Sequence, residues 1–521
     1  MENVSFKMTR RQLIQAAATS VFVTGMPNIT GCSSLPGYQP TGTDDNKALY
    51  LIHGNVVDVV RGEIRHNQTI TIKNGRIKTI YNYNQVPPAG EGDMIIDLKN
   101  QFVIPGLIDA HCHATLSGEA KLNPWGVLTT MNQLKRNYIQ QIKHGVTTIR
   151  DMGALPNLLH DHIKQIEKGE LIGPRVVYCN SFTNIYGGHP DVDPAAINIF
   201  APIAMAFTGR PNLWFKDTND LEEKMQINSS FGASFIKLTM DKKSVLCGKG
   251  EIPVYTDEHL KLIFDYAQKN NLSTAGHIHT KFGFDRAIQF GIGSVEHSIG
   301  DAVLTEKDVI AMAQKKIPVV PTMIVAQMLA EPEAYDELPQ KYRNDFIDRE
   351  MIIRRDYLHS SLDDYTETSI HENNLTHLKD YRKYGCANLY KKGKYMANPE
   401  IYFDILLNGP RNLMTMKDAG IIIGCGTDSG VPLSYHGTLW REMEMLCRIG
   451  LSNLEVLRCA TINNAKIIGM ADKIGSLDEG EYADLAVMKK NPLETGEIFS
   501  KPQIVIKGGK VYDISRISFT A

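Results

Sequence analysis

The sequence has little net charge and few cysteines, and each shortage excludes a class of protein. Its 56 Lys and Arg against 58 Asp and Glu leave a formal net charge of -2, and no basic stripe with interleaved aromatics occurs, so nucleic acid is not an expected partner. The eight cysteines include no C-x-x-C pair, which argues against a disulfide framework and favours buried free thiols. With 43% hydrophobic and 22% charged residues, the 521-residue chain has the composition of an ordinary globular protein with a large core.

The N-terminal segment has the pattern of an export signal. The twin arginines Arg10 and Arg11 precede an apolar, small-residue run at 16–23, which is too short to span a membrane and which predicts the Tat route. The sequence Ile29-Thr-Gly-Cys32 is similar to a lipobox, so Cys32 is expected to be lipidated, the alternative being a plain signal peptide with an incidental cysteine. We expect a periplasmic or membrane-anchored lipoprotein that meets the membrane only through this anchor, with 1–32 as signal and 33–47 as tether.

The most informative motif is a short apolar run that ends in two histidines. His111 and His113 close the segment at 104–114, one residue apart. Alternate side chains of a β-strand point to the same face, so both imidazoles should project together while Cys112 points away. Two neutral imidazoles at a strand end are natural ligands for zinc or a similar divalent metal.

Four further residues follow short apolar runs and could complete a metal site. Lys237 lies in Gly232-Ala-Ser-Phe-Ile-Lys-Leu238, where it is either a lysine whose head reaches solvent or a carbamylated, metal-bridging ligand. His277 and His297 end two more strand-like runs. Asp428 enters a glycine-rich turn after an apolar run that begins at Ile421. The order is therefore His-x-His, Lys, His, His, Asp, each at a predicted strand end.

This order resembles the amidohydrolase superfamily, and within it the imidazolonepropionase-like branch that includes exported Xaa-Pro and Xaa-Arg dipeptidases. The resemblance covers nearly all of residues 48–515 and is specific for the superfamily, much less so for the substrate. Besides the ligand pattern, three blocks carry it: Pro105-Gly-Leu-Ile-Asp-Ala-His111, Gly145-Val-Thr-Thr-Ile-Arg-Asp-Met-Gly153, and the stretch from Ala460-Thr-Ile-Asn-Asn-Ala465 to Gly475-Ser-Leu-Asp-Glu-Gly-Glu-Tyr-Ala-Asp-Leu485.

The resemblance implies a binuclear centre and a hydrolytic mechanism. Two divalent cations, with zinc the expected metal, would share carbamylated Lys237 and a bridging hydroxide that attacks the scissile carbonyl. Asp428 would accept the proton and pass it to the leaving nitrogen, which is a poor leaving group without it. The resemblance also implies that His111, His113 and Asp428 hold one ion and that His277 and His297 hold the other.

Alternating strand-like and helix-like segments predict an α/β fold, a (β/α)8 TIM-like barrel at 104–469. Both chain ends, 48–103 and 470–521, have strand-and-turn texture, and the resemblance implies that they pair into a small β-sandwich. A charged, tyrosine-rich insertion at 328–400 is expected to be a lid or substrate wall, or else a solvated decoration or homo-oligomer contact. Barrel strands are predicted near 107–112, 145–150, 174–178, 234–238, 273–277, 293–297, 318–322 and 421–427.

Three other residues are candidates with weaker patterns. His189 matches a substrate-facing histidine of the related dipeptidases, although the family's Thr-Gly-Gly-His-Gly is here Tyr186-Gly-Gly-His-Pro190, which changes the loop. Tyr255 could donate to a developing oxyanion, or simply pack in the core. His279 lies two residues beyond His277 and is expected to support the metal ligands from behind.

These patterns favour a metal-dependent hydrolase of an amide bond in a small dipeptide or N-acyl amino acid. Two other functions stay open at this point: the same metal centre acting on cyclic amides, lactones or phosphotriesters, and a non-catalytic binding lipoprotein. The last is disfavoured because all six predicted ligands are present. The ligands alone do not separate the first two functions, and only the expected export favours peptides and acylated amino acids.

Overall fold

A computed structural model describes most of the chain beyond the N-terminal segment. The predicted signal, Cys32 and most of the predicted tether lie outside the described residues. Parts of the loop after His189 and of the 328–400 insertion do so as well. The described ranges are 40–41, 47–84, 87–119, 127–190, 208–244, 251–330, 338–384, 400–494 and 501–517.

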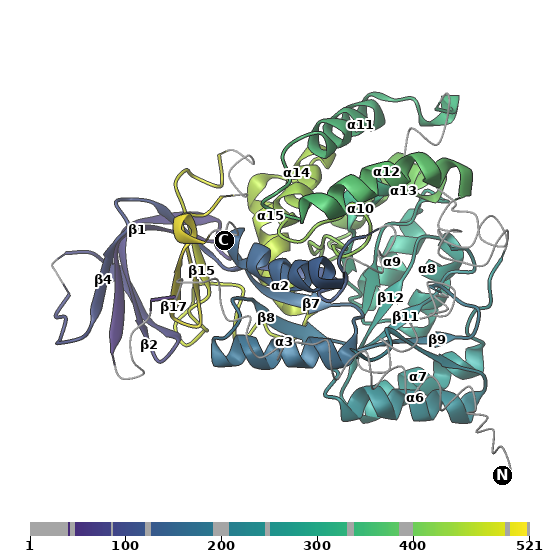
Figure 1. Ribbon diagram of the computed structural model, residues 1–521, viewed down its shortest axis with the longest axis horizontal. Coiled ribbons are helices and arrows are strands. Elements are labelled where there is room, and N and C mark those ends of the chain that lie inside the picture. The colour runs from purple at the N-terminus through teal and green to yellow at the C-terminus, as the bar shows by residue number, and fades with distance from the viewer. Residues whose placement is uncertain are drawn as a thin grey trace, which may run out of the picture.

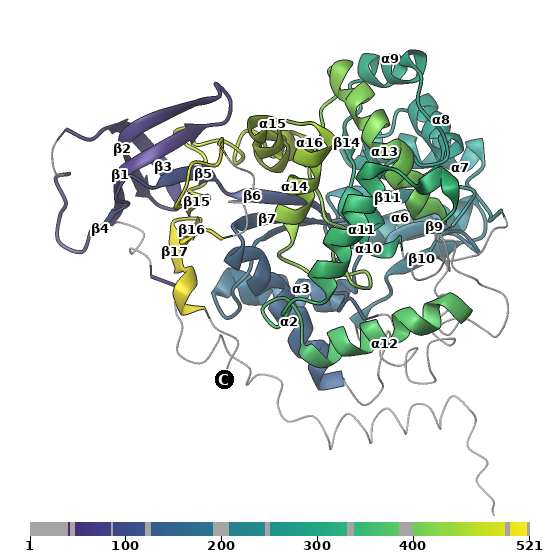
Figure 2. The same ribbon diagram turned by 90° about the horizontal axis from the view of Figure 1, so that it is seen from above.

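The two ends of the chain form one sheet, which lies to one side of the rest of the molecule (Figures 1 and 2). Strands from both ends meet where β5 pairs antiparallel with β15, Val103 opposite Val487. The sheet has eight strands in the order β17-β16-β15-β5-β1-β2-β3, and β4 pairs with β1. Its strands are β1 (Ala48–Asp58), β2 (Glu63–Lys73), β3 (Arg76–Asn82), β4 (Met94–Asp97), β5 (Phe102–Pro105), β15 (Leu485–Met488), β16 (Ile504–Lys507) and β17 (Lys510–Asp513).

A hydrophobic cluster of its own holds this sheet together. Leu51, Ile70 and Val103 from the N-terminal end pack with Leu485 and Ile506 from the C-terminal end, all fully buried. The alternation of apolar and polar residues in β2 places its apolar side chains on this buried face. The predicted pairing of the two chain ends thus takes the form of a single sheet, and the two-layered sandwich stays a prediction.

The remaining strands are parallel and belong mainly to two sheets. β6 (Leu107–Cys112), β7 (Val146–Asp151) and β8 (Arg175–Tyr178) form the first. The second contains β11 (Phe235–Thr239), β12 (Ser273–His277), β13 (Ser294–Glu296) and β14 (Val319–Val320). A short pair, β9 (Phe182–Ile185) and β10 (Asn212–Phe215), is parallel as well. Seven of the eight predicted barrel strands therefore occur, within a few residues of their predicted positions.

The eighth predicted strand, 421–427, forms isolated bridges instead. Ile423 bridges Val319 beside β14, and Ser429 bridges Cys112 at the end of β6, both in parallel. This segment therefore lies between the two parallel sheets and contacts both. The fold is mixed α/β.

Helices follow the parallel strands and cover them on the outside (Figure 2). Several begin with a threonine or serine whose side chain accepts a backbone N–H, such as Thr256, Thr280 and Thr305. The helices are α2 (Val127–Lys143), α3 (Pro156–Lys168), α6 (Thr218–Ser230), α7 (Asp257–Lys269), α8 (Lys281–Phe290), α9 (Glu306–Gln314), α10 (Met323–Leu329), α11 (Asp345–Leu358), α12 (Thr368–Tyr384), α13 (Glu400–Asp418), α14 (Leu439–Ile449), α15 (Asn453–Arg458) and α16 (Asn464–Ile467), with short helices η3 (Gln340–Tyr342), η5 (Cys459–Asn463) and η7 (Ile514–Arg516).

The insertion is helical where it is described, and buried ion pairs attach it to the fold. Glu350 of α11 is fully buried and accepts hydrogen bonds from Gln327 of α10 at 2.6 Å and from Arg448 of α14 at 2.6 and 2.9 Å. Ile347 of α11 packs in the same cluster as Phe403 of α13. These contacts join α11 to three helices of the main body.

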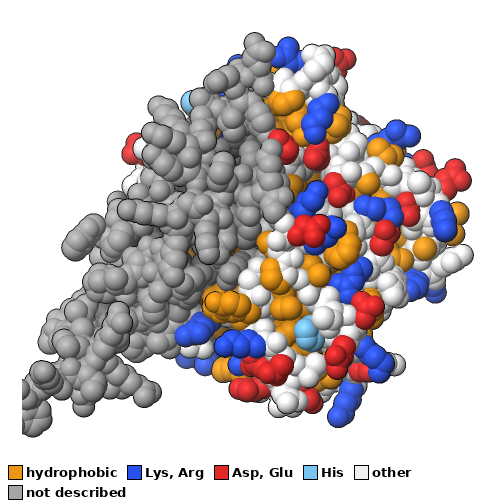
Figure 3. Space-filling model, turned by 90° about the vertical axis from the view of Figure 1, so that its right-hand side faces the viewer, with side chains coloured by type: hydrophobic (Ala, Val, Ile, Leu, Met, Phe, Trp, Pro, Cys, Tyr) orange, Lys and Arg blue, Asp and Glu red, His pale blue; other side chains and the backbone are white. Residues whose placement is uncertain are grey.

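The described surface is mixed in charge, and the described helices include none long and apolar enough to cross a membrane. Figure 3 shows Lys and Arg side chains interspersed with Asp and Glu over the described part of one face. This distribution matches the small net charge of the sequence.

Candidate metal centre

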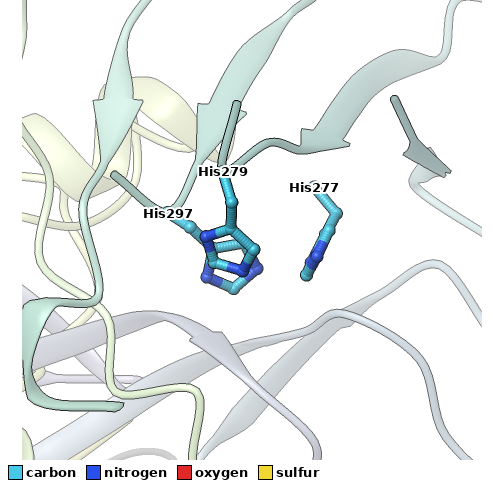
Figure 4. A group of neighbouring side chains, drawn as sticks. All are labelled: His277, His279 and His297. Carbon is cyan, nitrogen blue, oxygen red and sulfur yellow. The ribbon is translucent and has the colours of Figure 1, made fainter. Parts of the chain in front are cut away.

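The predicted ligands gather at the C-terminal ends of the parallel strands. His111 is the penultimate residue of β6, His277 ends β12, and His297 directly follows β13. Figure 4 shows His277, His279 and His297 extending toward one region from neighbouring strands. The ring of His297 lies 4.6 Å from that of His111 and 4.4 Å from that of His277, between centroids. In parallel α/β folds this strand edge is where catalytic groups collect.

Two groups of side chains are close enough to hold a metal ion, and His297 belongs to both. Potential ligand atoms of His277, His279 and His297 lie within 4.8 Å of one another, and so do those of His111, His297 and Asp428. These are the groups of three or more found among the described residues. Four of the six predicted ligands are therefore in them, with His279 in addition.

His113 adjoins the second group through Asp428. Its Nε2 lies 3.0 Å from Asp428 Oδ1, and His111 Nε2 lies 3.4 Å from the same oxygen. Backbone contacts fix this arrangement, because the N–H of Asp428 donates to the His111 carbonyl at 2.7 Å. Gly426 is required for the approach, since a Cβ there would lie 2.7 Å from the Cβ of His111.

Lys237 is buried beside these groups and its amine lacks a hydrogen bond. The side chain belongs to β11, is 1% exposed, and its Nζ has no hydrogen-bond partner. Burial lowers the pKa of Lys237 to about 8, although the charges of Glu296 and Asp428 oppose the shift. An unsatisfied buried amine is costly, which favours a modification or ligand that would satisfy it. A depressed pKa also supplies the neutral amine that carbamylation needs.

Contacts on the far side of each imidazole orient the histidines. Glu296 lies 2.8 Å from His111 Nδ1 and pairs with Arg150 Nη2 at 2.6 Å, all three side chains being buried. The Nδ1 of His113 lies 2.9 Å from the Gly153 carbonyl. His297 Nδ1 lies 2.7 Å from the Thr322 hydroxyl. In each case Nε2 is left for the centre, an arrangement typical of metal-binding histidines.

Burial keeps histidines of both groups in the neutral form that binds metal. Burial, followed by the charges of neighbouring imidazoles and Lys237, lowers the pKa of His277 and of His297 well below the usual value. Both are therefore neutral at physiological pH, as metal ligation requires. For Asp428, burial acts to raise the pKa, but hydrogen bonds and charges of His111 and His113 outweigh it and lower the pKa. Asp428 is accordingly an ionised carboxylate.

The three weaker candidates lie in different surroundings. His189 is buried, stacks on His277 at 4.4 Å between ring centroids, and its Nδ1 lies 2.7 Å from the Ser244 hydroxyl. His279 lies within the first group of possible ligands rather than behind it. The Tyr255 hydroxyl donates to the Thr183 carbonyl, which favours the core-packing alternative for this residue.

A polar cavity of about 80 Å³ adjoins His279. Lys243, Asp301, Glu400 and Asp404 bring charges of both signs to its wall.

Sequence patterns did not reveal the residues behind the ligands. Glu296 and Arg150 each lie in a buried strand, where a charged residue without a partner is costly. Their positions in apolar strand-like runs were therefore the one sequence signal that they pair with other groups. The contact of Thr322 with His297 has no counterpart in local sequence, because it joins two different strand ends.

Comparison with known proteins agrees with this geometry. The profile described as the amidohydrolase family matches residues 102–512. The chain belongs to the amidohydrolase family. Membership makes it a hydrolase of carbon–nitrogen bonds and confirms the resemblance seen in the sequence. Among curated relatives, an ochratoxinase of Aspergillus niger is 22% identical over 490 residues, covering 90% of this chain and 88% of that protein. An imidazolonepropionase of Geobacillus kaustophilus is 35% identical over 98 residues, or 18% of this chain and 23% of that one.

Solved structures support the same fold for this amidohydrolase. A Xaa-Pro dipeptidase with methionine bound in its active site superposes with a TM-score of 0.66 at 22% identity. The match covers 90% of this chain and 100% of that one. The crystal structure of the Aspergillus niger ochratoxinase gives a TM-score of 0.62 at 21% identity, over 90% of this chain and 96% of that one. At these identities the likeness concerns the fold alone.

Proposed function

We propose that this amidohydrolase uses two divalent metal ions to cleave an amide bond in a small dipeptide or N-acyl amino acid. The observation that carries the proposal is the convergence of His111, His277, His297 and Asp428 at one strand edge, beside the unpartnered amine of Lys237. We also propose that the parallel strands and segment 421–429 close a (β/α)8 barrel around this edge. Dipeptidase and ochratoxinase relatives, both named for amide or peptide substrates, support the choice of bond.

The side chains present fit such a centre. Neutral imidazoles and an ionised carboxylate are donors that zinc prefers, and a carbamylated Lys237 would add an anionic oxygen ligand between two ions. His111, His113 and Asp428 would hold one ion, and His277 and His297 the other. When bound, the metals would polarise the scissile carbonyl and lower the pKa of water to near neutrality.

The protein's own groups then orient the substrate and move a proton. Hydrolysis adds water across the C–N bond, so that the oxygen joins the acyl half and a proton must reach the leaving nitrogen. Asp428 Oδ1 lies 3.0 Å from His113 Nε2 and 3.4 Å from His111 Nε2, and it is suited to carry that proton. His189, stacked on His277 with its Nδ1 held by Ser244, presents Nε2 as a substrate contact.

A substrate screen with a single matched pair of variants tests the proposal. Zinc-loaded enzyme is offered dipeptides, N-acyl amino acids, cyclic amides, lactones and phosphotriesters. We expect amide cleavage, and a loss of about 10²–10⁴-fold in kcat for Asp428→Asn, because proton transfer is removed. Asp484→Asn serves as control and should retain activity, because this buried carboxylate lies just before β15 and pairs with Arg175 at the start of β8, the opposite end of that strand from the metal centre. Turnover confined to lactones or phosphotriesters would overturn the assignment.

A further inference from the structure

Thr322, the residue directly before α10, has an unusual backbone conformation. Thr322 has φ 44° and ψ 45°, in the left-handed region that a β-branched residue rarely adopts. Such conformations persist only where the surroundings impose them, and they concentrate at functional sites. Thr322 directly follows Pro321, just beyond β14, so its position is set at the strand edge that carries the metal centre.

The Thr322 side chain does not cap α10. A threonine that precedes a helix ordinarily accepts a backbone N–H of the first turn with its hydroxyl. Thr322 makes no such bond, and its hydroxyl instead lies 2.7 Å from Nδ1 of His297. The hydroxyl is thus directed at the one histidine that both groups of possible ligands share.

Glu442 caps the N-terminus of α10 instead of Thr322. This α14 residue is fully buried, and its two carboxylate oxygens accept the N–H groups of Met323 at 2.9 Å and Ile324 at 2.7 Å. These are the first two residues of α10, whose N–H groups have no partner within the helix. The distances leave no vacant N–H at these two positions for the Thr322 hydroxyl to satisfy.

We propose that Glu442 is a positioning residue for the metal centre, because by capping α10 it leaves the Thr322 hydroxyl to hold His297. The inference rests on the proposed function insofar as His297 binds metal. The hydrogen bonds of Glu442 come from the backbone of Met323 and Ile324, so its effect on the centre would pass through Thr322. Burial raises the pKa of Glu442, and the N–H groups of Ile324 and Met323 act against that shift by favouring the carboxylate.

The replacement Glu442→Gln separates positioning from packing. Glutamine has nearly the same volume but offers a single acceptor oxygen, and its NH₂ group would face a backbone N–H. One first-turn N–H would then attract the Thr322 hydroxyl away from His297. Thr322→Val removes the hydroxyl outright, and Thr322→Ser keeps it. Glu350→Gln is the matched control, since Glu350 is equally buried and contacts α10 at Gln327, away from His297.

Full-length protein loaded with cobalt(II) reports on the site without any substrate. The measurements are bound equivalents, the visible absorption of the bound ion, and the rate of its removal by a chelator. We expect Glu442→Gln and Thr322→Val each to release cobalt about tenfold faster or more and to change the spectrum, as loss of a support behind a ligand does. Thr322→Ser and Glu350→Gln should behave as the unaltered protein. Glu442→Gln should add nothing in the Thr322→Val background.

Three results would overturn the inference. Glu442→Gln could release cobalt no faster than Glu350→Gln, or its effect could add fully to that of Thr322→Val, and either would mean that Glu442 does not act through Thr322. Failure of the unaltered protein to bind cobalt would remove both this inference and the metal centre. Normal cobalt binding with the expected variant effects, but no amide hydrolysis, would uphold the positioning role while rejecting the proposed function.

Discussion

The proposed carbamylation makes assembly of the proposed metal centre depend on the protonation state of Lys237. Only a neutral amine reacts with carbon dioxide, and the lysine becomes a carbamate with loss of one proton. Because burial lowers its pKa to about 8, the neutral fraction rises as the pH approaches 8 and levels off above it. We therefore expect carbamate formation in metal-depleted protein to increase from about pH 6.5 to about pH 8.5, as followed by ¹³C NMR with labelled bicarbonate.

Lys507 provides the control for this prediction. Burial lowers the pKa of Lys507 to about 8 as well, yet its Nζ donates to the Gly173 carbonyl at 2.7 Å. Lys237→Arg should abolish the carbamate signal and the second metal equivalent, whereas Lys507→Arg should leave both. A signal that survives Lys237→Arg would show that the carbamate forms elsewhere.

The Arg150–Glu296 pair is a second residue-scale test, this time of stability. Arg150→Met would leave Glu296 buried without its cation, and we expect the free energy of unfolding in urea to fall by about 3–5 kcal/mol. Adding Glu296→Gln to that variant should restore part of the loss, because the unpaired charge is removed. Lys261→Met breaks an exposed pair with Asp265 and should cost less than about 1 kcal/mol. Equal losses in the two single variants would contradict the importance of burial.

At the scale of elements, the contacts of α11 with α10 and α14 predict that α11 is held in place and does not move as a lid. Glu350 ties α11 to α10 and α14 through buried ion pairs and hydrogen bonds. We expect the amides of 345–358 to resist hydrogen exchange nearly as well as those of α14. Arg448→Met, which leaves Glu350 short of its cation, should raise exchange selectively in α11. Rapid exchange of α11 in the unaltered protein would restore the lid interpretation.

Local sequence predicts an element well where the element's own pattern decides its structure. The strand-like run at 273–277 becomes β12 with the predicted bounds, and the ends of the parallel strands bring the histidines together as the pattern indicates. Segment 421–427 differs, because Gly424 and Gly426 fit against Asn464 and His111, and such close approach replaces a regular ladder by bridges. Glu442 could not be predicted, since its role depends on a contact between helices 119 residues apart.

The whole molecule is expected to work outside the cytoplasm, anchored by lipid at Cys32. Cys32→Ser should move the protein from the membrane to the soluble periplasmic fraction, because one acylated cysteine supplies the anchor. Replacing both Arg10 and Arg11 by lysine should retain it inside the cell. Cell fractionation with immunoblotting measures both effects. Soluble protein in the cytoplasm of unaltered cells would contradict the export signal.

The sheet made from both chain ends has a consequence for the order of folding. Gln101 donates to Gln503 across 402 residues of sequence, so β5 has no antiparallel partner until the C-terminal strands have been synthesised. Contacts this distant close slowly, and until then the edge of β5 is open to pairing with other chains. A nascent chain stalled before β15 should therefore aggregate or be degraded, whereas a completed chain protects its own edge.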